Sequence, residues 1–207
     1  MKIVVLTIEY PTKDNPLGGI FVEDHNLAMK KLGYKVSVFY NYFKSIKYFS
    51  IKNFYKFFFK NYNFMNKGIN HSYTFLFNFY FDRIKIFLDY FLTKKKLDDY
   101  IKLHGKPDLI ICHFSFPVIC TAKKIYEKYK IPYIIIEHST GYFTKLFSKD
   151  QLELICMGMK KALLVICVSN YLKKQLKSLF HLKNLVTVGN VVNSKIFNIK
   201  KKLNILK

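Results

Sequence analysis

Two adjacent glycines are the first residues in this chain whose type and place could do chemistry. Gly18 and Gly19 follow the apolar run KIVVLTI and precede a helix-like segment, in a chain that has only 8 glycines. A glycine pair lets another group approach the main chain, and the positive end of the following helix attracts phosphate. The pair therefore indicates either a cradle for a diphosphate or an ordinary flexible turn.

Polar side chains also follow two later apolar runs. His113 lies at the end of DLIICH, and Glu137, His138 and Ser139 end or follow PYIIIEH. The carboxyl ends of parallel strands meet at one edge of a sheet, so we expect these residues to face one cleft. Imidazoles can hydrogen-bond sugar hydroxyls or phosphate, and a carboxylate can accept from a hydroxyl. A purely structural role for each histidine stays open.

Metal and cofactor chemistry have no support in the sequence. His113 and His138 have no third ligand at a matching spacing, so no metal site is predicted. The patterns G-x-G-x-x-G, G-x-x-x-x-G-K-[ST], G-x-S-x-G and H-E-x-x-H are all missing. The four cysteines form no C-x-x-C pair and lie in or beside apolar runs, as buried free thiols do. We expect no cofactor.

The elements that must position these residues alternate along the chain. Six apolar runs are predicted as strands: Lys2–Ile8, Lys35–Tyr40, Asp108–Phe114, Pro132–His138, Ala162–Ser169 and Leu185–Asn190. Five amphipathic stretches are predicted as helices: Ile20–Leu32, about Phe81–Leu103, Val118–Tyr129, Lys149–Lys161 and Asn170–Phe180. Nearly continuous apolar strands are typical of a parallel sheet buried on both faces. The alternation predicts an α/β fold, a Rossmann-like doubly wound parallel sheet with helices on both faces.

A basic and aromatic insertion, residues 41–72, interrupts this alternation. Within Tyr42–Phe64, Lys52, Lys56 and Lys60 recur at helical spacing among many aromatic residues. Three interpretations stay open: an amphipathic helix at a membrane interface, a helix packed on the sheet, and a surface for single-stranded nucleic acid. The formal net charge of +22 favours an anionic partner, although an AT-rich genome also enriches lysine.

The most apolar stretch does not predict a membrane span. Tyr73–Leu92 carries four charged residues, and a bilayer-crossing helix needs about 20 predominantly apolar residues. The N-terminus shows no secretory pattern. We expect a cytoplasmic protein, either soluble or peripheral on the inner face of the cytoplasmic membrane.

Five blocks of this sequence resemble, in order, the N-terminal half of a family 4 glycosyltransferase. They begin MKIVVLTIEYPTKDNPLGGIFVEDHNLAMKKLGYKVSVFY and continue with KPDLIICHFSFP, IPYIIIEHSTGYF, VICVSNYLKKQL and VTVGNVVNSKIF. The resemblance implies one half of a GT-B fold: a Rossmann-like domain over residues 1–189, then the start of an interdomain crossover over 190–207. Such enzymes transfer a sugar from a nucleotide-sugar donor to an acceptor, usually with retention of anomeric configuration and without a metal.

The same resemblance implies a role for each residue at the strand ends. Gly18 and Gly19 match the loop that contacts the donor, and His113 matches the histidine that contacts the transferred sugar in the catalytic centre. We assign His113 to positioning the sugar rather than to abstracting a proton. The residues that match the acceptor side are Glu137, His138 and Ser139.

The predicted function is the acceptor-side half of a glycosyltransferase that builds cell-surface polysaccharide or glycolipid. The resemblance implies a C-terminal domain that binds most of the nucleotide, and we expect this domain to be absent from the chain. We therefore expect a partner domain, in cis or in trans, a saccharide or lipid-linked acceptor, and little activity from this chain alone. The alternatives are a non-catalytic peripheral membrane module and an inactive truncated gene product. Nucleic-acid binding rests on charge alone and is not expected.

Overall fold

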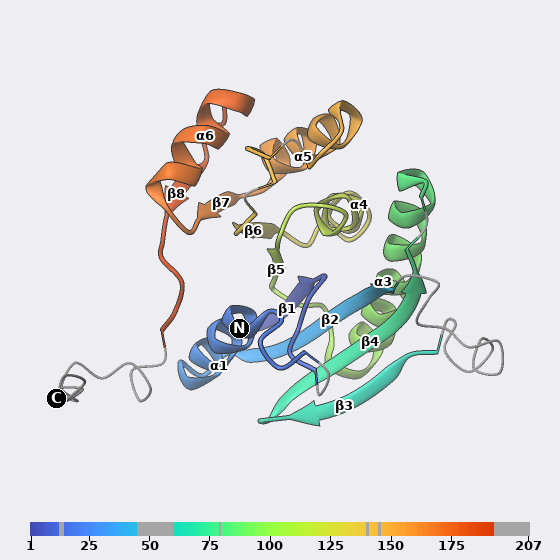
Figure 1. The fold of residues 1–207 in the computed structure, drawn as a ribbon. Coiled ribbons are helices and arrows are strands. Elements are labelled where there is room, and N and C mark those ends of the chain that lie inside the picture. Colours follow the sequence, from blue (N-terminus) through green and yellow to red (C-terminus); the bar gives the residue numbers. More distant parts are fainter. Residues whose placement is uncertain (13–14, 45–59, 79, 140, 145, 193–207) are drawn as a thin grey trace, which may run out of the picture.

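Eight strands form one sheet in the computed structural model, which describes residues 1–12, 15–44, 60–78, 80–139, 141–144 and 146–192 (Figure 1). The strands are β1 (Lys2–Thr7), β2 (Lys35–Lys44), β3 (Tyr62–Asn66), β4 (Ile69–Phe77), β5 (Leu109–His113), β6 (Tyr133–Glu137), β7 (Leu164–Cys167) and β8 (Leu185–Thr187). Their order is β3-β4-β2-β1-β5-β6-β7-β8. Neighbouring strands pair in parallel except β3, which pairs antiparallel with β4.

Helices cover both faces of this sheet. They are α1 (Ile20–Lys31), α3 (Asp82–His104), α4 (Val118–Tyr129), α5 (Lys149–Lys161) and α6 (Asn170–Phe180). Val22 and Met29 of α1 pack into the apolar layer on one face, whereas the buried residues of the other four helices pack on the opposite face. This arrangement confirms the predicted doubly wound α/β fold.

Local signals in the sequence end and begin the helices as expected. Gly33 and Gly105, which follow α1 and α3, both adopt positive φ angles (86° and 74°) that glycine tolerates best. Ser169 caps α6, because its hydroxyl accepts from the backbone N–H of Leu172. Ser148 begins α5 with a reciprocal capping box to Gln151.

The ends of the predicted insertion are strands, which corrects its interpretation as an irregular segment. Residues 41–44 continue β2, and residues 62–66 and 69–77 form the hairpin β3–β4 at the edge of the sheet. Aromatic side chains explain the difference, because they fit the pleated surface of a sheet and pair across strands. The Tyr40 and Tyr73 rings stack 5.3 Å apart, and Tyr42 stacks on Phe75 at 5.6 Å. Residues 45–59, which make up most of the proposed helix, lie outside the described residues.

The apolar stretch Tyr73–Leu92 divides between two elements. Its first residues complete β4 and its last residues form the first half of α3. Within the described part of the chain, no helix has the length and apolarity to span a bilayer.

A buried polar network joins α3 to the sheet and to α4. Asn41 on β2 donates to a carboxylate oxygen of Asp89 (2.7 Å) and to the hydroxyl of Thr93 (3.0 Å). Lys96 donates to the side-chain oxygen of Asn41, and Thr121 on α4 donates to the second oxygen of Asp89. Burial raises the pKa of Asp89 and lowers the pKa of Lys96 to about 7.

Candidate functional site

Three loops meet at the carboxyl edge of the sheet. The glycine loop leaves β1, the turn after β5 begins at His113, and the turn after β6 begins at Glu137. β5 lies between β1 and β6 and pairs in parallel with both. Parallel pairing places the carboxyl ends of all three strands side by side, as expected for a binding edge.

Strand alternation sends the polar side chains of this edge to two different faces. Neighbouring residues of a strand point to opposite faces of a sheet. His113 and His138 point to the face that α1 covers, because both contact side chains of α1. Glu137, one residue before His138, lies on the other face and contacts Tyr142 there. The sequence predicted Glu137 and His138 together on the acceptor side, but their side chains lie on opposite faces of the sheet.

Three imidazoles form a continuous chain beneath α1. His25 Nδ1 lies 3.3 Å from His113 Nε2, and His113 Nδ1 lies 3.1 Å from His138 Nε2. His113 is only 1% exposed, and both of its ring nitrogens are used by the two neighbours. The residue predicted to contact the sugar thus sits in the middle of the chain. The Nδ1 atom of His138, at one end, is buried and has no partner among the described residues.

All three imidazoles are neutral near pH 7. Burial lowers the pKa of His25, lowers that of His138 to about 4, and, with the neighbouring rings, holds the pKa of His113 well below its usual value. A neutral imidazole carries one N–H and therefore donates through one nitrogen and accepts through the other. In a chain of three, all N–H groups run in the same direction. His138 Nδ1 and His25 Nε2 are therefore coupled, so that one donates when the other accepts.

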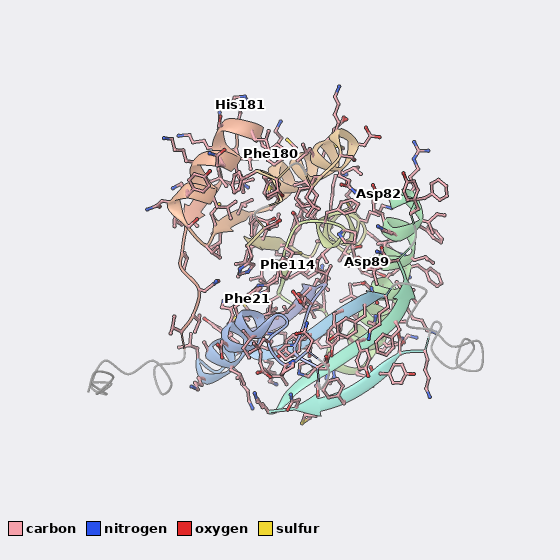
Figure 2. All side chains as sticks on the ribbon, viewed as in Figure 1. Phe21, Asp82, Asp89, Phe114, Phe180 and His181 are labelled. Atoms are coloured by element: carbon pink, nitrogen blue, oxygen red, sulfur yellow. The ribbon has the colours of Figure 1, made fainter. Side chains whose placement is uncertain are left out.

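Aromatic rings hold this chain in place. The Phe21 ring lies 4.2 Å from the His138 ring and 5.6 Å from the Phe114 ring, and Figure 2 shows Phe21 and Phe114 close together between α1 and the sheet. Phe21 and His25 stand four residues apart on α1 and so share one face of that helix. Sequence reasoning missed His25. The signal was this spacing, in the first turns of the helix that follows the glycine loop.

Glu137 organises the turn that carries His138 and Ser139. One oxygen accepts from the backbone N–H groups of His138 (2.9 Å) and Ser139 (2.8 Å), and the other accepts from the Tyr142 hydroxyl (2.8 Å). The Tyr142 hydroxyl also contacts Ser115 Oγ at 2.6 Å, which ties the β5 turn to the β6 turn. Glu137 is fully buried, and burial raises its pKa. In this arrangement its carboxylate positions the turn, while contact with an acceptor stays a prediction.

The glycine loop packs against its own chain. Gly19 adopts a left-handed conformation (φ 65°), and a Cβ there would lie 2.6 Å from the backbone oxygen of Glu9. The N–H of Gly18 donates to Asn15, and a Cβ on Gly18 would meet the Asn15 side chain and a carboxylate oxygen of Glu9. Local packing therefore requires glycine at position 19, whereas at position 18 the Asn15 and Glu9 side chains would have to move. Donor binding at this loop stays a prediction.

Alanine at Gly19 is expected to destabilise the protein more than alanine at Gly33. Gly33 also has a positive φ (86°), but a Cβ there would meet nothing within 4 Å. Gly33→Ala should therefore cost only the left-handed conformation, about 1–2 kcal/mol. Gly19→Ala should add about 1–3 kcal/mol because the new methyl group meets backbone atoms that cannot rotate away. Urea unfolding of both variants measures the difference, and equal losses would contradict the packing argument.

A groove of about 400 Å³ lies away from this edge, between α3 and the strands β2, β3 and β4. Lys96 and Tyr100 line it from the helix, and Ser37 and Asn63 line it from the sheet. It contains neither the imidazole chain nor the glycine loop. Within the described residues, no group of three or more His, Cys, Asp or Glu side chains could hold a metal ion.

Two solved structures with this fold each hold a nucleoside diphosphate and a sugar compound. Starch synthase IV from Arabidopsis thaliana, bound to ADP and acarbose, matches with TM-score 0.59 and 13% identity over 96% of this chain and 53% of its own. HepE from Anabaena, bound to UDP and glucose, matches with TM-score 0.61 and 14% identity over 95% of this chain and 46% of its own. Such identities establish the shared Rossmann-like fold of these glycosyltransferase structures. This chain spans about half the length of these two proteins.

A sucrose-phosphate synthase structure from Thermosynechococcus elongatus matches over a similar length. Its TM-score is 0.56 at 12% identity, covering 95% of this chain and 93% of that one. No curated protein sequence matches the chain. The sequence model of glycosyltransferase family 4 matches residues 19–195, which contain the imidazole chain and most of the sheet. With this match, the chain belongs to glycosyltransferase family 4.

Proposed function

We propose that this chain is the acceptor-side domain of an enzyme that transfers a sugar from a nucleotide-sugar donor to a saccharide or lipid-linked acceptor. One observation supports it above others: the residues that match the family's motifs gather at the carboxyl edge of the sheet. His113 and His138 are in direct contact, and Phe21, two residues after Gly19, packs on His138. Elements more than 80 residues apart in the chain therefore converge on one place.

The chain's own groups suggest how the donor is oriented. The first turn of α1 presents the positive end of a helix, which stabilises negative charge on a departing nucleotide diphosphate. The Glu9 carboxylate stands beside Gly18, so a sugar ring with hydroxyl donors suits the point next to it better than a phosphate does. Within this proposal the donor sugar lies at the glycine loop with the diphosphate directed toward the helix.

The imidazole chain supplies the second polar contact. His138 Nδ1 is buried and has no partner within the described part of the chain, and such an atom costs free energy unless a ligand or water satisfies it. A sugar hydroxyl fits this atom, because a hydroxyl both donates and accepts and so suits either direction of the chain. His113 then positions His138 instead of reaching the sugar itself. Because burial lowers the pKa of His138 to about 4, its imidazole is a weak base, which agrees with a retaining transfer that uses no general base on this domain.

The proposed enzyme includes a second lobe, in cis or in trans, which binds most of the nucleotide. Without it we expect weak donor binding and little transfer. The proposed location is the cytoplasm, at the inner face of the cytoplasmic membrane, and the proposed product is a cell-surface polysaccharide or glycolipid.

Binding and transfer measurements test this proposal. We expect titration calorimetry to show binding of at least one of UDP-glucose, ADP-glucose or GDP-mannose, at least about ten-fold tighter when the chain is co-expressed with the coding sequence that follows it. The same preparation should transfer radiolabelled sugar to a lipid or saccharide extract. Circular dichroism checks that the chain is folded. A folded assembly that neither binds nor turns over any nucleotide sugar would contradict the proposal.

A further inference from the structure

The first half of α3 and the two residues before it expose a row of large apolar side chains, called here the α3 stripe. The stripe consists of Tyr80, Phe81, Ile84, Phe87 and Phe91, which are between 40% and 92% exposed. Phe87 and Phe91 stand four residues apart on the helix, and their rings stack with centroids 6.2 Å apart. Contiguous exposed apolar surface of this kind marks a place where another molecule binds.

Positive charge borders this stripe. Arg83 is exposed four residues before Phe87, so the two side chains are neighbours on the helix surface. Lys95 is exposed four residues after Phe91 and continues the line of the stripe. Further along the helix, Asp98 is paired with Lys94 at 2.5 Å, and the exposed Asp99 stands one turn beyond Lys95. Aromatic side chains beside cations are typical of a surface that lies in the headgroup region of an anionic bilayer.

The stripe stands at the carboxyl edge of the sheet. The chain leaves the carboxyl end of β4 at Phe77 and enters α3 at Asp82, so the first turns of α3 lie at the edge that also carries the glycine loop and the imidazole chain. β8, after which the described chain ends at residue 192, is the strand at the opposite side of the sheet from β3 and β4. Figure 1 shows α3 on the far side of the fold from that end.

We propose that the α3 stripe docks this protein on an anionic lipid bilayer, with Phe87 and Phe91 inserted among the headgroups and Arg83 and Lys95 at the lipid phosphates. Charge favours a bilayer over a second copy of the chain, because two molecules of net charge +22 repel each other. The position of the stripe also favours a bilayer over a second lobe. A second lobe in cis would continue from β8, at the opposite side of the sheet from β3 and β4. Docking here brings the bilayer to the proposed transfer site, and this consequence rests on the proposed function for its lipid-linked acceptor.

Vesicle sedimentation tests this inference with the full chain. The probes are vesicles of phosphatidylcholine mixed with phosphatidylglycerol, and vesicles of phosphatidylcholine alone. We expect binding only to the anionic vesicles, weakened by salt. The double variant Phe87→Ser with Phe91→Ser should bind at least about ten-fold more weakly, because it removes the inserted area. Arg83→Glu with Lys95→Glu should lose a similar factor.

A matched control is Tyr171→Ser on α6, which removes an aromatic side chain of 62% exposure elsewhere on the surface and should leave binding unchanged. The inference is overturned if the aromatic double variant binds like the unchanged protein, or if the unchanged protein does not sediment with anionic vesicles. It is also overturned if sedimentation equilibrium shows a dimer that the same variant disperses. If the assembled protein binds vesicles but no nucleotide sugar, the membrane inference is supported and the proposed function is contradicted.

Discussion

Replacing His113 with phenylalanine is expected to lower sugar transfer by the assembled enzyme at least about 100-fold while the chain stays folded. Phenylalanine keeps a ring of similar size between His25 and His138 but removes both nitrogens through which His113 contacts them. His138 then loses the contact that fixes its ring, and nothing in the imidazole chain determines whether its Nδ1 carries the proton. The loss should fall mainly on kcat, because in the proposed function the donor is bound chiefly by the second lobe.

The control for this variant is His104→Phe, which changes a histidine of α3 whose side chain is exposed and far from the edge. Its transfer rate should match that of the unchanged enzyme. His25→Phe breaks one link of the chain rather than two and should have an intermediate effect. If the His113→Phe enzyme is folded and fully active, the imidazole chain is not needed for transfer and the prediction is wrong.

The titration of the imidazoles tests the buried geometry of the chain. In the folded state, the pKa of His138 is lowered to about 4 from an ordinary 6.5. Between these pH values the unfolded chain binds a proton that the folded chain does not, so stability rises with pH from about 4 to about 6.5, by up to about 3 kcal/mol for this group. Nitrogen-15 NMR spectra of the free chain should show the His138 and His113 rings neutral from about pH 5.5 upward, and the His25 ring with a pKa below its ordinary value. A ring of the chain that titrates near 6.5 would contradict the geometry.

Replacing Asp89 with alanine is expected to destabilise the fold by about 3–5 kcal/mol. The carboxylate accepts from Asn41 and Thr121, and all three side chains are buried. Its removal leaves the buried Thr121 hydroxyl without its acceptor and takes one of the acceptors of the Asn41 amide, which keeps Thr93. Lys96 also loses the negative charge that raises its pKa. Because these groups join β2, α3 and α4, the loss should appear as a lower midpoint of global unfolding in guanidinium chloride.

A neighbouring residue on the same helix supplies the control. Asp99 is exposed, and Asp99→Ala should change stability by about 0.5 kcal/mol or less. A second variant, Lys96→Met, tests the charge. Because the pKa of Lys96 is lowered to about 7 in the fold, the unfolded chain binds more protons between about pH 7 and 10.5, and stability rises with pH there. Lys96→Met should flatten this rise. If Asp89→Ala and Asp99→Ala are equally stable, the network does not hold α3 to the sheet.

Much of the fold was predictable because its signals are local. Each apolar run from KIVVLTI to LVTVGN contains a strand, since strands buried on both faces read as continuous apolar segments. Gly33, Gly105 and Ser169 end or begin helices, because backbone conformation and capping depend on a few neighbouring residues. The hairpin β3–β4 was not predicted. Its residues are rich in aromatics and polar groups, and their partner strand β2 lies far back in the sequence.

The candidate site, like the fold, was predictable only in part. The sequence alone determined that His113 and His138 end neighbouring strands, because strand ends are read from composition. Only the tertiary structure decided that Glu137 turns away from His138, that His25 contacts His113 across 88 positions, and that the described helices and strands leave the α3 stripe exposed. The reason is physical: a pattern of residues records whether a segment is buried, whereas contacts between distant segments are set by strand register and by which face each helix covers.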